Sequence, residues 1–364
     1  MVRTVDAVNG NRPANGNRPR VPALDVFRGL AVMCMVVVHA ARLVHDGANN
    51  SQFRSALTLF EPAISAAFLW IVGSSLHRSH FSICRGQLRA SQTGTSWRRW
   101  YRSCALRAAK LYAVGVVLFL LQYGVQSPDV WASPDILSTI AWAILLVGLL
   151  LPLGTWGLIG GAVAGFTVLA TVQFGEFNVS GVNAGPGATV PLIAIACVGA
   201  CHGLGEGHRS QQVVWALGGV ICSLGALSLP GELVDLHASR YANGTVWFWN
   251  HTLRGTALYG GAVVAAAAVV QGLSAQVSFW DGAWATPLSV LGRHALLTYV
   301  GHLLVLGAVD RWLPLAPSWM TFLTLSLGLL GLFVGIAMVV ESARYREAQR
   351  ALRVHLGLPR NSSS

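Results

Sequence analysis

The chain has 364 residues, of which 54% are hydrophobic and only 11% are charged. Soluble domains carry about 25% charged residues, so this composition excludes a soluble globular protein and indicates an integral membrane protein. The formal net charge of +11 could suggest a nucleic-acid binder. However, the basic residues lie in the connections between apolar runs, which is the pattern that membrane topology produces. No nucleic-acid partner is therefore expected.

Ten apolar runs approach the length of about 20 residues that a membrane span requires. The sequence thus predicts an all-α fold, a polytopic membrane helix bundle of about ten transmembrane helices. The runs cover residues 24–44, 56–76, 104–124, 135–152, 155–174, 188–205, 212–229, 253–272, 287–308 and 318–340. We divide the chain into a disordered cytoplasmic tail (1–22), a transmembrane domain (23–341) and a basic cytoplasmic tail (342–364).

The placement of arginine predicts the orientation of the bundle. Arginines gather in the N-terminal tail, in the connection after the second run and in the C-terminal tail, whereas residues 125–134 and 175–187 have none. Positive charge is kept on the cytoplasmic side, so both termini are expected in the cytoplasm and the protein in the inner or plasma membrane. The long segment 230–252 then lies outside. The six cysteines lack zinc-site spacing, and no metal is expected.

The first apolar run carries ionisable residues that a simple membrane anchor would not contain. Arg28 and His39 are eleven positions apart, about three helical turns and about 16 Å along the axis, so we expect them to share one helix face. An ionisable residue at membrane depth is a functional-site hypothesis. A guanidinium suits phosphate, and an imidazole suits general-base catalysis. The alternative is that Asp25 and Arg28 form an interfacial ion pair and that His39 is a packing residue.

Three further residues are candidates for catalysis. His45 lies near the outer boundary and points to another side of the helix from His39; the alternative is a solvated loop histidine. Glu61 lies near the outer surface, where it could orient an imidazole or an acceptor group, or simply complement the helix dipole. His302 lies deep in the ninth run, so it needs a polar partner, either as a packing residue or as part of the site.

Basic residues near the inner surface are candidates for binding a nucleotide-like cofactor. Arg107 and Lys110 penetrate deeper into the third run than the arginines before them, and Arg293 lies at the inner end of the ninth run. Phosphates would bind such a group of cations. The alternative is that topology alone accounts for their positions.

The segment from Leu24 to Ala31, followed by His39, resembles the opening helix of membrane acyltransferases. Arg28, ten intervening residues and His39 match the pattern of the acyltransferase-3 family. The segments 68–75 (Phe68 to Ser75) and 299–302 (Tyr-Val-Gly-His) resemble the branch of heparan-alpha-glucosaminide N-acetyltransferases. In that branch the histidine tied to catalysis lies after the first span, so His45 is its nearer counterpart, whereas His39 is the counterpart in the acyltransferase-3 family.

The resemblance implies transfer of an acetyl or other acyl group from a cytoplasmic acyl-CoA to a sugar or small hydroxyl or amine acceptor on the outer side. His39 would act as general base or as transient acyl carrier, and Arg28, Arg107 and Lys110 would hold the CoA phosphates. The expected partners are acyl-CoA (acetyl-CoA in the simplest case), a glycan or small-molecule acceptor and the lipid bilayer; a homodimer is left open. The alternative function is a proton-coupled transporter that relays protons through His39, Glu61 and His302.

Overall fold

The computed structural model describes most of the chain between the two predicted tails. The described residues are 22–45, 51–90, 95–125, 131, 135–177, 179, 181–183, 189–204, 209–233, 235–241, 244–274, 285–313 and 318–342. The tails predicted at 1–22 and 342–364 lie almost wholly outside them. The first described helix begins at Pro22 and the last ends at Glu341; the division into two tails and a transmembrane domain stays a prediction.

The described part of the chain is mainly helical, so the predicted all-α membrane bundle is confirmed. Each of the ten apolar runs contains a helix or, in one case, a pair of helices. The helices are α1 (Pro22–His45), α2 (Ser51–Ala90), α3 (Thr95–Tyr123), α5 (Ile136–Leu150), α6 (Gly154–Phe174), α7 (Val190–Leu204), α8 (Arg209–Leu227), α9 (Leu253–Ser274), α11 (Ala285–Arg293), α12 (Ala295–Trp312) and α13 (Trp319–Glu341), with a short 3-10 helix (Leu151–Leu153) joining α5 to α6.

By length and apolar composition, six described helical segments could cross a membrane, or seven if the bent pair of α11 and α12 counts as one span. This number is lower than ten for physical reasons. The segments α5 and α6 run together as one apolar stretch of 39 residues, and α7 is a shorter apolar helix. The long helix α2 mixes apolar residues with Glu61, His77, Arg78 and several serines.

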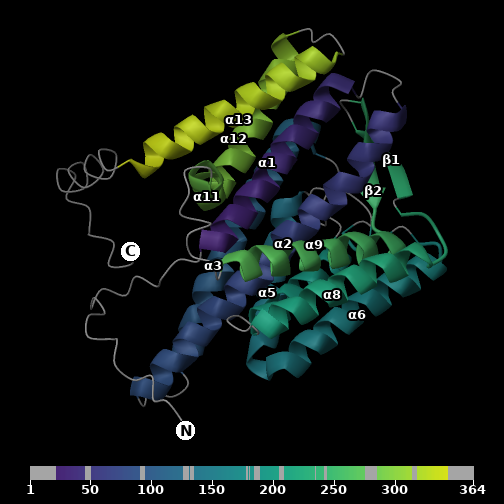
Figure 1. Cartoon of the computed structure of the whole chain (residues 1–364). Coiled ribbons are helices and arrows are strands. Elements are labelled where there is room, and N and C mark those ends of the chain that lie inside the picture. The colour runs from purple at the N-terminus through teal and green to yellow at the C-terminus, as the bar shows by residue number, and fades with distance from the viewer. Residues whose placement is uncertain are drawn as a thin grey trace.

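The first two helices form the centre of the bundle, and the other helices pack on their two sides (Figure 1). On one side α1 contacts α11, α12 and α13; on the other, α2 contacts α5, α7 and α9. The core is continuous around the fully buried Trp70 of α2. A second cluster joins α1 to α12 and α13 through residues such as Val36, Leu306 and Phe333.

Glycines allow α1 and α11 to approach with their backbones in contact at two places. A Cβ atom on Gly29 of α1 would lie 1.8 Å from the Leu288 carbonyl oxygen of α11, and one on Gly292 would lie 1.8 Å from the Asp25 carbonyl oxygen. Small residues permit such close packing in membranes. Since Gly29 lies opposite Leu288 and Asp25 opposite Gly292, α11 runs antiparallel to α1.

The ninth predicted run, 287–308, is not the continuous span that the sequence suggested. It divides at His294 into α11 and α12, which meet at an angle of 84°. Two contacts hold the bend: Arg293 Nε lies 3.3 Å and His294 Nε2 lies 3.0 Å from carboxylate oxygens of Glu341, at the end of α13. Because Gly292 of α11 lies against Asp25 of α1, these contacts also place the start of α1 and the end of α13 on one side of the bundle.

The segment predicted as a long outer loop contains a β-hairpin. Strand β1 (Asp235–Tyr241) pairs antiparallel with β2 (Gly244–Asn250), with Asp235 opposite Asn250. The β2 sequence is rich in β-branched and aromatic residues, which favour strands. Composition over 20-residue windows, which identifies membrane spans, does not detect so short a hairpin.

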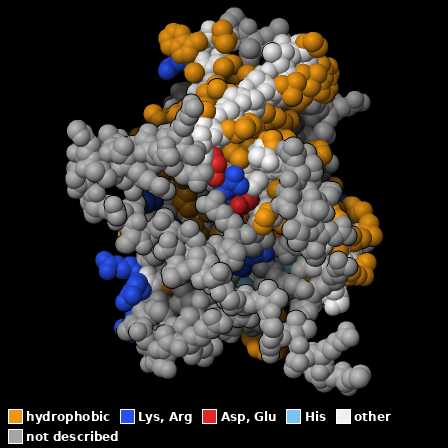
Figure 2. Space-filling model, turned by 60° about the vertical axis from the view of Figure 1, so that its left-hand side comes forward, with side chains coloured by type: hydrophobic (Ala, Val, Ile, Leu, Met, Phe, Trp, Pro, Cys, Tyr) orange, Lys and Arg blue, Asp and Glu red, His pale blue; other side chains and the backbone are white. Residues whose placement is uncertain are grey.

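Apolar side chains cover much of the described outer surface, as expected for a bundle in lipid. Figure 2 shows these side chains on one face, with charged groups gathered in a few places. Large exposed apolar residues are frequent on α6, α8 and α13. They include Trp156, Val163, Val214, Leu217, Ile221, Met320, Leu327 and Val339.

Candidate active site

Two histidines from distant parts of the sequence meet inside the bundle. His39 of α1 and His302 of α12 are joined by a hydrogen bond of 2.8 Å between His39 Nδ1 and His302 Nε2, and their ring planes differ by only 8°. His302 is fully buried, and His39 is half-buried. The structure therefore brings together two residues that the sequence singled out separately.

The hydrogen bonds of the pair determine which nitrogen carries each proton. His302 Nδ1 lies 2.8 Å from the Thr298 carbonyl oxygen, and a carbonyl can only accept, so Nδ1 of His302 donates. In neutral His302 the Nε2 atom is then the acceptor, and His39 Nδ1 must donate to it. The remaining nitrogen, His39 Nε2, keeps its lone pair. The pair thus presents one oriented imidazole nitrogen that can accept a proton.

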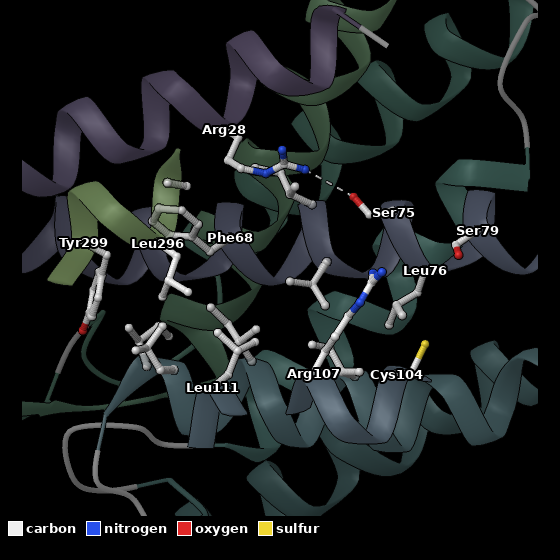
Figure 3. A pocket seen from close by; sticks show the side chains of 17 residues that line it. Arg28, Phe68, Ser75, Leu76, Ser79, Cys104, Arg107, Leu111, Leu296 and Tyr299 are labelled. Carbon is white, nitrogen blue, oxygen red and sulfur yellow. Dashed lines mark hydrogen bonds between the residues drawn. The ribbon is translucent and has the colours of Figure 1, made fainter. Parts of the chain in front are cut away.

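A cavity of about 280 Å³ lies between α1, α2, α3, α5 and α12. Figure 3 shows Arg28 and Arg107 entering it from opposite sides, and Tyr299 at the end away from Ser79 and Cys104. Apolar side chains of α2, α3, α5 and α12 form most of the remaining wall. This lining consists of Phe68, Ile71, Val72, Leu76, Leu111, Ile136, Leu137, Ile140, Ile144, Ala295 and Leu296. An apolar cavity with two cations suits a ligand that combines a long uncharged part with anionic groups.

We call the end of the cavity at Tyr299 its outer end and the opposite end, near Ser79 and Cys104, its inner end, after the orientation predicted from the arginines (Figure 3). Arg28 is held in place by several groups toward the inner end. Its NH1 atom lies 3.0 Å from Asp25 Oδ1 and 3.4 Å from the Gly292 carbonyl oxygen, and its NH2 atom lies 3.5 Å from Ser75 Oγ. The interfacial Asp25–Arg28 pair that the sequence offered as an alternative is therefore present. The two roles are compatible, because the same guanidinium also lines the cavity.

The other predicted cations divide between the cavity and its surroundings. Arg107 lines the cavity. Lys110, one turn further along α3, is exposed and is not among the lining residues. Arg293 also lies away from the lining: it donates to Ser289 Oγ at 2.7 Å and pairs with Glu341 at the α11–α12 bend.

The predicted acidic residue at the outer side, Glu61, forms an ion pair with an arginine. Glu61 is buried, and its Oε1 atom lies 2.8 Å from Arg42 Nε. Arg42 follows His39 by one turn of α1, so the ion pair lies beside the histidine pair. His45 is the last residue of α1; its side chain lies outside the described residues.

Two residues of this region, Tyr299 and Asp135, were given no role in the site by the sequence analysis. Tyr299 lines the outer end of the cavity and donates a hydrogen bond of 2.5 Å to Asp135 Oδ1. The Tyr299 ring also packs against His302 in an edge contact, with ring centroids 5.7 Å apart. Asp135 gave a detectable signal, since an Asp directly before an apolar run is a typical helix N-cap. Tyr299 begins the Tyr-Val-Gly-His segment that carries part of the resemblance, but a tyrosine within a span does not by itself indicate a role in the site.

Arg28 and His39, which we expected to share one helix face, do not both line this cavity. Arg28 lines it, but neither imidazole does; the nearest link is Tyr299, which lines the cavity and contacts His302. Within the described part of the chain, no group of three or more His, Cys, Asp or Glu residues could hold a metal ion.

Comparison with known families supports the resemblance to one branch of membrane acyltransferases. Residues 20–184 match the family model of the heparan-alpha-glucosaminide N-acetyltransferase catalytic region. The match covers less than half of the chain. It includes Arg28, His39 and Arg107. Tyr299 and His302 follow the matched region in the sequence, and α12 places them beside the matched residues. No curated protein matches the sequence. The chain is thus a multi-pass membrane protein that is similar to a membrane acetyltransferase over its first half.

Proposed function

We propose that the protein is a membrane acyltransferase that moves an acetyl or other short acyl group from cytoplasmic acyl-CoA to a hydroxyl or amine of a sugar or small molecule on the outer side. The observation that carries this proposal is the His39–His302 pair, which presents an oriented base beyond one end of a cavity that holds two arginines near its other end. The family match over residues 20–184 supports the class of reaction.

In this proposal the cavity binds the donor. Arg28 and Arg107 bind phosphate groups of acyl-CoA, because guanidinium groups form paired, charge-assisted hydrogen bonds with phosphate. The apolar walls surround the uncharged arm that carries the thioester. Arg107 is free to turn toward a phosphate, since its side chain is exposed. The acyl group then lies toward Tyr299, at the outer end of the cavity.

The histidine pair supplies the acid–base chemistry. His39 Nε2 accepts the proton of the acceptor hydroxyl or amine while the acceptor atom forms a bond to the thioester carbonyl carbon. The C–S bond breaks, and the CoA thiolate receives the proton that His39 holds, so the products are the acylated acceptor and free CoA. His302 stabilises protonated His39 by accepting its Nδ1–H. General acid–base catalysis of this kind contributes about 10²- to 10⁴-fold to the rate. A transient acyl group on His39 Nε2 is the alternative route.

A second candidate function is proton-coupled transport. The broken segment at His294 favours it, because discontinuous helices are common at transporter sites. However, Glu61 forms an ion pair with Arg42, whereas the three-residue relay that the sequence suggested needs Glu61 to exchange protons with an imidazole. Uptake of a solute into vesicles without acyl-CoA would support transport over transfer.

The proposed function is tested with purified protein in lipid nanodiscs, acetyl-CoA labelled in the acetyl group, and a panel of amino sugars, neutral sugars and simple alcohols. We expect the label on at least one acceptor and its loss in the His39→Gln variant. Absence of label on every acceptor, for acetyl-CoA and longer acyl-CoA alike, would contradict the proposal.

Donor binding can be measured independently of the acceptor. Cys104 lines the cavity, so bound acyl-CoA should slow its reaction with N-ethylmaleimide, followed by mass spectrometry. Cys222 of α8 is exposed outside the cavity lining and serves as the internal control. Equal labelling of Cys104 with and without acyl-CoA would show that the donor does not occupy this cavity.

A further inference from the structure

Tyr299 separates the donor cavity from the imidazole pair. Tyr299 lines the cavity, and its ring also contacts the ring of His302, which is not among the lining residues. Tyr299 itself is buried. Figure 3 shows its hydroxyl directed away from the two arginines. A donor in the cavity would therefore meet the tyrosine ring before it met either histidine.

The separation is too large for reaction. The Tyr299 and His302 rings have centroids 5.7 Å apart, and His302 lies outside the cavity lining. A carbonyl carbon that contacts the Tyr299 ring in the cavity is therefore not in contact with His302, since nonbonded carbon atoms in contact already lie about 3.5–4.0 Å apart. Reacting atoms must approach to about 3–3.5 Å. His39 is a further hydrogen bond of 2.8 Å away. The transfer chemistry proposed above thus requires the Tyr299 side chain to move.

One hydrogen bond holds Tyr299 in this position from the opposite wall. Its hydroxyl donates to Asp135 Oδ1 at 2.5 Å, and Asp135 is the N-cap residue of α5, whose next residues Ile136 and Leu137 also line the cavity. The bond therefore ties α12 to α5 across the outer end. The second carboxylate oxygen, Asp135 Oδ2, is buried and has no hydrogen-bond partner among the described residues.

We infer that Tyr299 is a positioning residue that acts as a gate between the thioester and His39, and that Asp135 is its latch. The inference rests on the proposed function. A hydroxyl or amine of the arriving acceptor donates to the unpartnered Asp135 Oδ2. Each new donor on the carboxylate weakens its bond to Tyr299, so the ring turns aside when an acceptor is present. Asp135 is thus also part of the acceptor site.

The gate has a chemical purpose that can be measured. If the ring moved without an acceptor, water would take the acceptor's place, attack the thioester carbonyl and break the C–S bond, giving the free carboxylic acid and CoA. The latch therefore suppresses hydrolysis of acyl-CoA relative to transfer. The quantity that reports on the gate is the ratio of hydrolysis to transfer, because a residue with a purely structural role would change both rates together.

The test compares this ratio in the full-length protein in nanodiscs with acetyl-CoA, first without and then with the acceptor that the panel identifies. Tyr299→Phe keeps the ring and removes the latch bond; we expect the ratio to rise about tenfold, the effect of losing about 1.4 kcal/mol. Asp135→Asn keeps an N-cap residue and an acceptor oxygen but removes the charge. Since neutral hydrogen bonds are about half as strong, its ratio should rise by a smaller factor, about threefold. Acetyl-CoA affinity should stay within about twofold of the wild type in both variants, because the arginine end is unchanged.

The matched control is Tyr112→Phe. Tyr112 of α3 donates a similar bond of 2.5 Å to the Trp131 carbonyl but does not line the cavity, so its ratio should equal that of the wild type. If the ratio of hydrolysis to transfer is unchanged in both Tyr299→Phe and Asp135→Asn, the gate is overturned, but the proposed acyl transfer is not. The same conclusion follows if the ratio rises equally in the Tyr112→Phe control. If Tyr299→Phe does not fold, Asp135→Asn decides alone. A wild-type protein that neither hydrolyses nor transfers acetyl from acetyl-CoA overturns the proposed function, and the gate with it.

Discussion

The two ends of the cavity hold their polar groups in different ways. At the inner end Arg107 is exposed, and two of the three contacts of Arg28 are long, at 3.4 and 3.5 Å. At the outer end the polar atoms form short bonds in a fixed order: 2.8 Å from His39 to His302, 2.8 Å from His302 to the Thr298 carbonyl, and 2.5 Å from Tyr299 to Asp135.

This difference agrees with a division between binding and chemistry. Long, flexible cationic side chains can rearrange around a charged ligand at modest cost. A general base, in contrast, needs one tautomer and one orientation, which short hydrogen bonds to neighbouring groups provide. Changes at the inner end should therefore alter donor affinity, and changes at the outer end should alter the rate of the chemical step.

The largest expected effect comes from disrupting the close packing of α1 against α11. In Gly292→Val the new side chain would meet the Asp25 carbonyl oxygen, 1.8 Å from the Cβ position. Overpacking costs about 1–3 kcal/mol of stability where neighbouring side chains can shift. The neighbour here is helix backbone, which cannot shift in this way, so we expect a larger loss of stability. Little monodisperse protein should appear on size-exclusion chromatography. Gly307→Val is the control, since its Cβ position has no atom within 4 Å. Equal behaviour of the two variants would contradict the close α1–α11 packing.

The next effect tests the orientation of the base. His302→Phe keeps a ring but removes the acceptor for His39 Nδ1–H. We expect kcat to fall by at least about tenfold, with KM for acyl-CoA nearly unchanged. The fall should be smaller than the about 10²- to 10⁴-fold loss expected for His39→Ala. Steady-state kinetics at saturating acceptor measures both. A raised KM with unchanged kcat would place His302 in donor binding instead.

A smaller effect is expected at the inner end. Arg107→Ala removes a cavity cation and should raise the Kd for acyl-CoA about tenfold, which corresponds to about 1.4 kcal/mol, while kcat at saturation stays close to that of the wild type. Lys110→Ala is the matched control on the same helix, because Lys110 does not line the cavity. The division of roles fails if both variants weaken binding to the same extent, since general positive charge would then explain the result.

The smallest effect concerns pH and the loop that precedes α9. His251 is buried and hydrogen-bonded to Tyr259, and burial lowers the pKa of His251 to about 3. The unfolded chain has an ordinary histidine pKa of about 6.5, so it binds a proton between these values while the folded state does not. The contribution of neutral His251 to the free energy of unfolding is therefore fully present above about pH 6.5. It falls as the pH decreases toward 3, by at most about 1.4 kcal/mol per pH unit.

Thermal unfolding in detergent at pH 7.5 and 5.5 measures this dependence. The wild type should lose more stability between the two pH values than His251→Gln, whose amide oxygen can still accept from Tyr259 but whose side chain does not titrate. An equal loss in the two proteins would show that other groups determine the acid sensitivity.

Much of the fold could be predicted from the apolar runs, but its irregular elements could not. Each run contains a helix, because the cost of an unpaired backbone in lipid leaves few other structures. The break at His294 was not predicted: Arg293 and His294 are typical of the inner end of a span, and only the distant Glu341 makes them part of a bend. The hairpin at 235–250 was missed because its aromatic residues also fit a membrane interface.

The candidate site could be predicted where ionisable residues interrupt apolar runs. Arg28, His39 and His302 stand out as ionisable residues within apolar runs, and the fold brings the two histidines into contact. Their contact joins residues 263 positions apart, which no local pattern can reveal. Asp135 and Tyr299, separated by 164 positions, have ordinary roles in sequence terms, as a helix cap and as a membrane tyrosine. Their importance follows only from where the cavity ends.

The most direct test of the division between the two ends is the equilibrium dissociation constant of acetyl-CoA for two single variants, measured by calorimetry in nanodiscs and set beside their transfer rates. The account predicts that His39→Ala binds acetyl-CoA within about twofold of the wild type while transfer is lost, and that Arg107→Ala binds about tenfold more weakly while transfer at saturation persists. Weakened binding in His39→Ala with unchanged transfer at saturation would contradict it.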